Sequence, residues 1–195
     1  MKKFLALLLA AMMVLGAVSA LAEEAGFEEF PITVDGSVEG ADEEIDLDEV
    51  PLHVAAVYFQ PVPMEPADQA GLAVEDSNIH LEADIHWNEN GYGFDVGDWV
   101  PYLTVEYCIT SETTGKVAVD WSSFMVMSAD DGPHYGANVA LPESDTYTLT
   151  FRIHSPAENG YLLHVDDETG VPTHEFWADP IEVNFVHWEY TVQEW

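Results

Sequence analysis

Residues 79–87 alternate between apolar and polar side chains with a strict period of two. On a β-strand this period sends Leu81, Ala83 and Ile85 to one face and the intervening polar residues to the other. The polar face carries His80, Glu82, Asp84 and His86. An imidazole and a carboxylate two residues apart on such a face can bind one metal ion together. The pattern therefore predicts a strand with one face in a core and metal-binding chemistry on the other.

Similar short runs, rich in β-branched and aromatic residues, recur along the chain between glycine-containing turns such as Asn90-Gly91 and Asn159-Gly160. Runs of this kind favour strands. The expected strands are 52–60, 79–87, 99–110, 115–127, 146–153, 160–165 and 181–192. The sequence shows no long amphipathic helix. A series of short strands with regular turns predicts an all-β fold, an immunoglobulin-like antiparallel β-sandwich.

The N-terminal residues have the composition of a secretory signal peptide, with basic Lys2 and Lys3, an apolar run and the cleavage pattern Ala20-Leu21-Ala22. The expected domain organisation is a signal peptide over 1–22, an acidic N-terminal arm over 23–50 that lays one short strand on the domain, and a metal-binding β-sandwich domain over 51–195. No other stretch is long and apolar enough to span a membrane, so no integral membrane span is expected after cleavage. We therefore expect the protein to be secreted across the cytoplasmic membrane.

The net charge of the chain limits the classes of function that the protein can have. The chain has 4 Lys and Arg against 37 Asp and Glu, a formal net charge of −33. Such a field repels nucleic acid and anionic membranes and attracts cations. The sequence has no glycine-rich phosphate loop and no Ser-His-Asp or Cys-His arrangement, so kinase and hydrolase functions lack support. Cys108 is the single cysteine, which excludes an internal disulfide.

Three of the eight histidines stand out by their surroundings. His80 has Glu82 as a neighbour on its strand face, His134 follows the turn Asp131-Gly132-Pro133, and His164 precedes an acidic turn. Each lies near the end of an expected strand. Because the loops of a β-sandwich cluster at its two ends, residues far apart in sequence can meet there. These histidines are therefore the candidate metal ligands.

A thioether would extend this ligand set. Met125 and Met127 share one face of an expected strand, and their spacing does not decide which of them is a ligand. Thioether favours copper, imidazole suits copper, iron or zinc, and carboxylate favours harder ions. The mixed set therefore suits Cu(II) and Cu(I) and can accept iron or manganese. Asp84 and His86 extend the polar face of their strand to roughly 20 Å, which is too long to serve one metal centre.

Four longer motifs resemble the periplasmic ferrous-iron transport proteins, the copper- and iron-binding partners of the high-affinity iron permease, which are similar also to the treponemal lactoferrin-binding antigen. The motifs are 57–66, 80–86, 97–104 and 131–136. The resemblance extends from Phe27 to Tyr190, and the motifs follow one another in the same order as in the family. It implies an immunoglobulin-like homodimer.

The resemblance also implies a metal site. The family's copper ligands fall on His80, Glu82, Met127, His134 and His164. Asp131 falls beside these ligands or near the position of iron. Copper and iron are thus the implied metals, with manganese or zinc able to substitute.

Together these features predict an extracytoplasmic iron-uptake protein of the periplasm or cell-envelope space. It would bind copper and iron and deliver iron to an iron permease in the cytoplasmic membrane, as a binding protein and not an enzyme. Two alternatives remain open. A copper-dependent ferroxidase would turn over with oxygen, whereas a host-protein-binding or adhesive acidic β-sandwich would not use the histidines.

Overall fold

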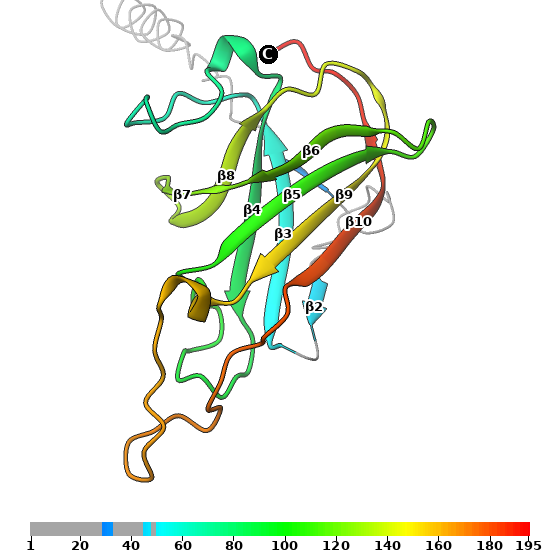
Figure 1. Cartoon of the computed structure of the whole chain (residues 1–195). Coiled ribbons are helices and arrows are strands. Elements are labelled where there is room, and N and C mark those ends of the chain that lie inside the picture. The colour runs from blue at the N-terminus through cyan, green and yellow to red at the C-terminus, as the bar shows by residue number, and fades with distance from the viewer. Residues whose placement is uncertain (1–28, 33–44, 48–49) are drawn as a thin grey trace, which may run out of the picture.

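The alternating strands place their apolar residues between two antiparallel β-sheets, which pack face to face as a sandwich (Figure 1). The computed structural model describes residues 29–32, 45–47 and 50–195. The predicted signal peptide, residues 1–22, and much of the predicted acidic arm lie outside these ranges. Within them, no helix has both the length and the apolar character needed to cross a membrane. The predicted all-β sandwich is confirmed.

The larger sheet has the strand order β1-β3-β4-β8-β7, and β2 also pairs with β3. Its strands are β1 (Phe30–Pro31), β2 (Ile45–Leu47), β3 (Leu52–Phe59), β4 (Ile79–Trp87), β7 (Met125–Ser128) and β8 (Pro133–Val139). Both short strands of the predicted arm, β1 and β2, lie along β3. Because β4 has β3 on one side and β8 on the other, its polar residues lie in the middle of a sheet face.

The smaller sheet has the order β10-β9-β5-β6. Its strands are β5 (Thr104–Ser111), β6 (Val117–Ser123), β9 (Asp145–His154) and β10 (Ile181–Tyr190). Two short 3₁₀ helices, η1 (Val74–Asp76) and η2 (Pro156–Asn159), lie in the connections. The long connection from η2 to β10 projects from one end of the sandwich, as the orange loop at the bottom of Figure 1 shows.

The core contains one face of each of the strands β3, β4, β5, β9 and β10. Leu81, Ala83 and Ile85 of β4 are fully buried, as the alternating pattern predicts, and they share a hydrophobic cluster with Leu149 and Phe151 of β9. Burial of a leucine or isoleucine side chain stabilises the folded state by about 1.5–3 kcal/mol. The sandwich is therefore held by apolar packing between the sheets, and the opposite face of β4 remains available for polar chemistry.

The structure differs from the predicted strands in three places. The expected strand 115–127 is divided at Phe124, which is buried and separates β6 in one sheet from β7 in the other. The expected strand 160–165 is absent, because Tyr161 packs on the rings of Phe94 and Phe176 instead of pairing in a sheet. Strand β8 was not expected, since Pro133 and the neighbouring glycines are typical of turns.

Candidate metal centre

Three neighbouring strands of the larger sheet build the candidate site. Across β4 and β8, Glu82 lies opposite Gly136, and across β8 and β7, His134 lies opposite Met127. Side chains two residues apart share a face, so His80 and Glu82 of β4 face the same side as His134 of β8. The antiparallel register thus brings together residues that are about 50 positions apart in the sequence.

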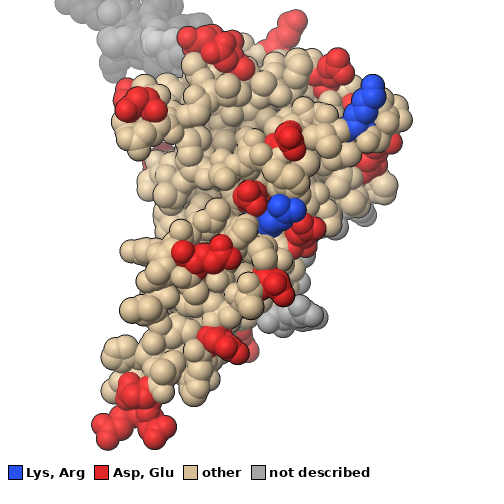
Figure 2. Space-filling view, viewed as in Figure 1, with Lys and Arg blue, Asp and Glu red and all other residues tan. Residues whose placement is uncertain are grey.

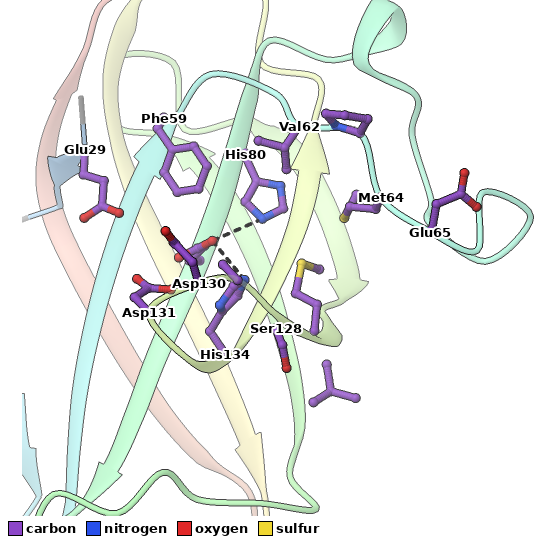
Figure 3. A pocket seen from close by; sticks show the side chains of 15 residues that line it. Glu29, Phe59, Val62, Met64, Glu65, His80, Ser128, Asp130, Asp131 and His134 are labelled. Atoms are coloured by element: carbon purple, nitrogen blue, oxygen red, sulfur yellow. Dashed lines mark ion pairs between the residues drawn. The ribbon is translucent and has the colours of Figure 1, made fainter. Parts of the chain in front are cut away.

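Glu82 lies between the two imidazoles (Figure 3). Its Oε1 atom is 3.0 Å from Nε2 of His134 and 3.4 Å from Nε2 of His80. All three residues are buried, and one ligand atom from each lies within 4.8 Å of the others. Among the residues that the structure describes, this is the one place where three such side chains converge in this way. The geometry supports a shared metal position between them.

Asn138 fixes the orientation and the tautomer of His80. Its Nδ2 atom donates to the carbonyl oxygens of Val62, at 2.9 Å, and Leu72, at 3.0 Å. The Oδ1 atom therefore faces Nδ1 of His80, at 2.9 Å. Because a side-chain amide oxygen only accepts, Nδ1 carries the proton and Nε2 carries the lone pair. An imidazole held in this way is a typical metal ligand.

The Nε2 atom of His80 is fully buried and has no hydrogen-bond partner. A buried polar atom left unsatisfied costs about 1–3 kcal/mol, so an ordered water or an ion is expected to complete it. Gly136 keeps the space in front of this atom open, because a Cβ atom at residue 136 would lie 2.8 Å from Nε2. The residues therefore fit a metal ion, to which Nε2 of His80 could donate its electron pair.

Electrostatics favour an ionised carboxylate here. Burial alone would raise the pKa of Glu82, but its contacts with His134 and His80 lower it to about 2. Burial opposes protonation of His134, yet the contact with Glu82 and the nearby acidic charges raise its pKa overall. Asp84, two residues along β4, has its pKa raised to about 6 by burial and by the charge of Glu82. Glu82 is thus an anionic ligand at neutral pH.

A cavity of about 640 Å³ opens in front of the three residues. Two of the other predicted site residues, Met127 and Asp131, line it. So does Glu29, whose pKa is raised by burial and by the charges of Glu82 and Asp131. The cavity therefore offers thioether sulfur and further carboxylate oxygen beside the imidazoles.

His164 is the predicted ligand that the structure does not bring to the cavity. It lies in the loop that follows η2, at the opposite end of the sandwich from the start of β4 (Figure 1). Its side chain is 81% exposed, and its Nδ1 atom is 3.3 Å from Oγ1 of Thr169 and 3.5 Å from Oδ2 of Asp166. Within one chain, His164 is separate from the other four predicted ligands.

The sequence reasoning missed Asn138 and Gly136. The signal that could have found them is a second period-two pattern, in which His134, Gly136 and Asn138 share one face of β8. A glycine in a strand indicates the close approach of another group. The same reasoning rejected Asp84 and His86 as ligands of this centre, and the converging group in the structure contains neither of them.

Comparison with known proteins identifies the family of this chain. The model of the family described as Fe2+ transport protein matches residues 27–192. The 34 kDa membrane antigen of Treponema pallidum is 42% identical over 174 residues, which cover 88% of this chain and 78% of that protein.

Solved structures of similar proteins also match this chain. Crystal structures of FetP from the uropathogenic E. coli strain F11 and of copper-reconstituted P19 from Campylobacter jejuni superpose with TM-scores of 0.72 and 0.73, at 37% and 38% identity. The matches cover 87% and 86% of this chain and 100% and 99% of those chains. The resemblance that the sequence motifs carried is confirmed, and the chain belongs to the Fe2+ transport protein family.

Proposed function

We propose that this protein is an extracytoplasmic iron-uptake protein that binds copper at the His80, Glu82 and His134 cluster and delivers iron to a permease in the cytoplasmic membrane. The observation that carries the metal site is the buried Nε2 atom of His80, which makes no hydrogen bond and which Asn138 holds as an electron-pair donor. Membership of the iron-transport family supports the uptake function, and the periplasmic expression of FetP supports the location.

The donor set suits copper. Two imidazoles and a carboxylate bind Cu(II), and the thioether of Met127 on the cavity wall would favour Cu(I) as well. P19, which has the same fold, has been crystallised with copper. Bound copper would supply one-electron redox chemistry at this position. The protein's own contribution is to hold Glu82 ionised and to fix the donor atom of His80 before the metal arrives.

Iron is the proposed cargo. Glu29, Asp130 and Asp131 line the same cavity as the histidines and offer oxygen ligands next to the copper position. The wider surface is strongly acidic. Figure 2 shows acidic side chains scattered across the visible face and gathered at its lower tip. Asp166, Asp167 and Glu168, in the connection from η2 to β10, are all exposed. Such a field concentrates cations near the protein and speeds their association.

A homodimer is part of the proposal, because it would let His164 take part. His164 is exposed on a projecting loop and cannot complete the site of its own chain. Its Nδ1 atom faces Asp166 and Thr169, which leaves Nε2 free to reach outward. We therefore assign His164 to the metal site of a second copy.

Isothermal titration of the metal-free protein with Cu(II), and separately with Fe(II), tests the site. We expect one copper per chain, and we expect His80→Ala and His134→Ala each to lose it. His187→Ala is the matched control, because His187 pairs with Glu112 on the smaller sheet, far from the cavity lining. Weak, multiple binding that is the same in all four proteins would overturn the proposed site, since the acidic surface would then be collecting cations.

The proposed protein is a carrier. Fe(II) given to the copper-loaded protein in air should be bound in a fixed ratio to the chain, without sustained oxygen consumption. Continued oxygen uptake with excess Fe(II) would show a copper-dependent ferroxidase instead. If partner binding to host proteins persisted in His134→Ala while all metal binding was lost, the adhesive function would replace the one proposed.

A further inference from the structure

The methionines of this protein gather in one place. The chain has six, of which Met1, Met12 and Met13 precede the described residues. The other three are Met64, in the connection from β3 to η1, and Met125 and Met127, on β7. All three line a single cavity of about 320 Å³ between that connection and the edge strand. Every methionine that the structure describes therefore borders the same space.

Strand geometry and one glycine bring the thioethers together. Met125 and Met127 are two residues apart on β7 and share a face, whereas Val126 between them is 64% exposed. The connection passes close to the strand at Gly71, where a Cβ atom would lie 3.3 Å from Cε of Met125. Gly71 also has a φ of 70°, a conformation that glycine adopts without strain. A side chain at residue 71 would push Met125 out of its place.

These methionines lie at the edge of the core, where Met125 packs against its buried residues. Methionine most often fills gaps in a hydrophobic core. Here each of the three is only partly buried, and none belongs to the fully buried core residues of the described chain. Leucine would fill the same wall with a less flexible side chain than methionine. Packing by itself therefore does not require three thioethers around an open cavity.

The methionine cavity adjoins the candidate metal centre. It shares Met64, Glu65, Val126 and Met127 with the larger cavity in front of the histidines. Met64 lies on the connection at the edge of that larger cavity (Figure 3). Met127 lies opposite His134 in the register of β7 and β8. A metal ion could therefore pass from thioether to imidazole ligands by moving along the shared wall.

We propose that Met64, Met125 and Met127 form a second metal site, which takes a soft monovalent cation, Cu(I). Thioethers are neutral, soft ligands that prefer Cu(I) to Cu(II), whereas the His80, Glu82 and His134 cluster contains the carboxylate that favours a divalent ion. The protein would thus hold two sites of different softness on one cavity wall. Met127, which the family resemblance counts among the ligands of the first site, lines both cavities and would be shared between the sites. This inference goes beyond the proposed function, because it needs only the methionine cavity and stands whether or not the protein carries iron.

Silver(I) is the probe, because it shares the soft, closed-shell character of Cu(I) and does not change oxidation state under these conditions. The protein is prepared with ¹³C-methyl methionine, and the methyl signals are followed by NMR as Ag(I) is added. We expect the signals of Met64, Met125 and Met127 to shift together at one equivalent. Cys108→Ala is titrated in parallel, since a thiol also binds silver, and it should behave in the same way.

Variants separate the two sites. Met64→Leu combined with Met125→Leu keeps the side-chain volume and should weaken Ag(I) binding about tenfold or more, with Cu(II) binding unchanged. Val126→Leu is the matched control, because it alters the same wall without removing sulfur, and should bind both ions normally. His80→Ala combined with His134→Ala should lose Cu(II) and keep Ag(I), even though the proposed copper site is then absent.

Two results would overturn the proposal. One is Ag(I) binding that leaves the methyl signals of Met64 and Met125 in place in the wild-type protein, a result that does not depend on how any variant folds. The other is Ag(I) binding that disappears in the double histidine variant and survives in the double methionine variant. In either case the soft cation would be bound outside the methionine cavity, and the methionines would only fill space.

Discussion

Two clusters of histidine and glutamate, one on each sheet, differ in a way that explains which can bind a metal. On the larger sheet, the carboxylate of Glu82 lies between the imidazoles of His80 and His134. On the smaller sheet the order is reversed. The imidazole of His154 lies between two carboxylates, with Nε2 at 3.1 Å from Glu106 and Nδ1 at 3.0 Å from Glu158.

The difference is the availability of a lone pair. Both ring nitrogens of His154 already have a carboxylate partner, Glu158 at Nδ1 and Glu106 at Nε2. The cluster is also partly exposed, and the guanidinium of Arg152 lies 3.6 Å from Glu106. His80 instead has one nitrogen committed to Asn138 and the other buried without a partner. Of the two clusters, only the one on the larger sheet therefore leaves an imidazole nitrogen available to a metal ion.

The largest expected effect concerns the stabilisation by copper and compares His134 with His154, one histidine from each cluster. A ligand that binds only the folded state at 100 times its dissociation constant stabilises it by about 2.7 kcal/mol, which raises Tm by roughly 5–10 °C in a domain of this size. Thermal melting with and without Cu(II) should show this increase in the wild type and in His154→Ala, and none in His134→Ala. An equal increase in both variants would mean that the buried cluster is not the copper site.

Gly136→Ala should have the next largest effect, because it fills the space in front of His80. The added methyl lies 2.8 Å from Nε2, so we expect overpacking to lower the free energy of unfolding by about 1–3 kcal/mol and copper affinity to fall as the imidazole moves. Urea unfolding measures the first quantity, and calorimetric titration measures the second. In the His80→Ala variant the imidazole that the new methyl would meet at 2.8 Å is absent, so adding Gly136→Ala there should cost little stability. Additive costs would show that the glycine has another role.

Asn138→Ala should weaken copper binding by about 10- to 100-fold without removing any ligand, since partners of ligating histidines typically have effects of this size. The matched control is Asn184→Ala on the smaller sheet, whose amide oxygen accepts from the hydroxyl of Thr150. Competition titration against a copper chelator measures both affinities. Equal affinities in the two variants would remove the orienting role that we assign to Asn138.

The smallest expected effect concerns the tautomer of His164. The hydroxyl of Thr169 donates to Oδ2 of Asp166, at 2.8 Å, so its oxygen accepts from Nδ1 of His164. Asp166→Asn would present an amide N–H to Thr169, reverse this chain of donors and move the imidazole proton to Nε2. The ¹⁵N shifts of the ring in the metal-free protein report the tautomer, with Asp167→Asn as the control. An unchanged tautomer in Asp166→Asn would show that solvent, and not this turn, sets it.

The alternating pattern of β4 was enough to predict both its core face and the pair His80 and Glu82, because a period of two translates directly into the faces of a strand. Strand β8 escaped prediction because Gly132, Pro133 and Gly136 are local turn signals, and only the long-range pairing with β4 and β7 overrides them. The same limit applies to the site. The direction of the Asn138 amide is set by carbonyl groups more than 60 residues away, which no local pattern reports.

Asn138 also connects the candidate metal centre to the wall of its cavity. Its amide holds both ends of the segment from Val62 to Leu72, the wall of the cavity that carries Met64, and the same group orients His80. If this segment swings away to admit or release an ion, these hydrogen bonds break and His80 loses the partner that fixes its donor atom. Opening the entrance and loosening the grip on the metal are then one motion, so slow amide exchange at Val62 would accompany slow release of the ion.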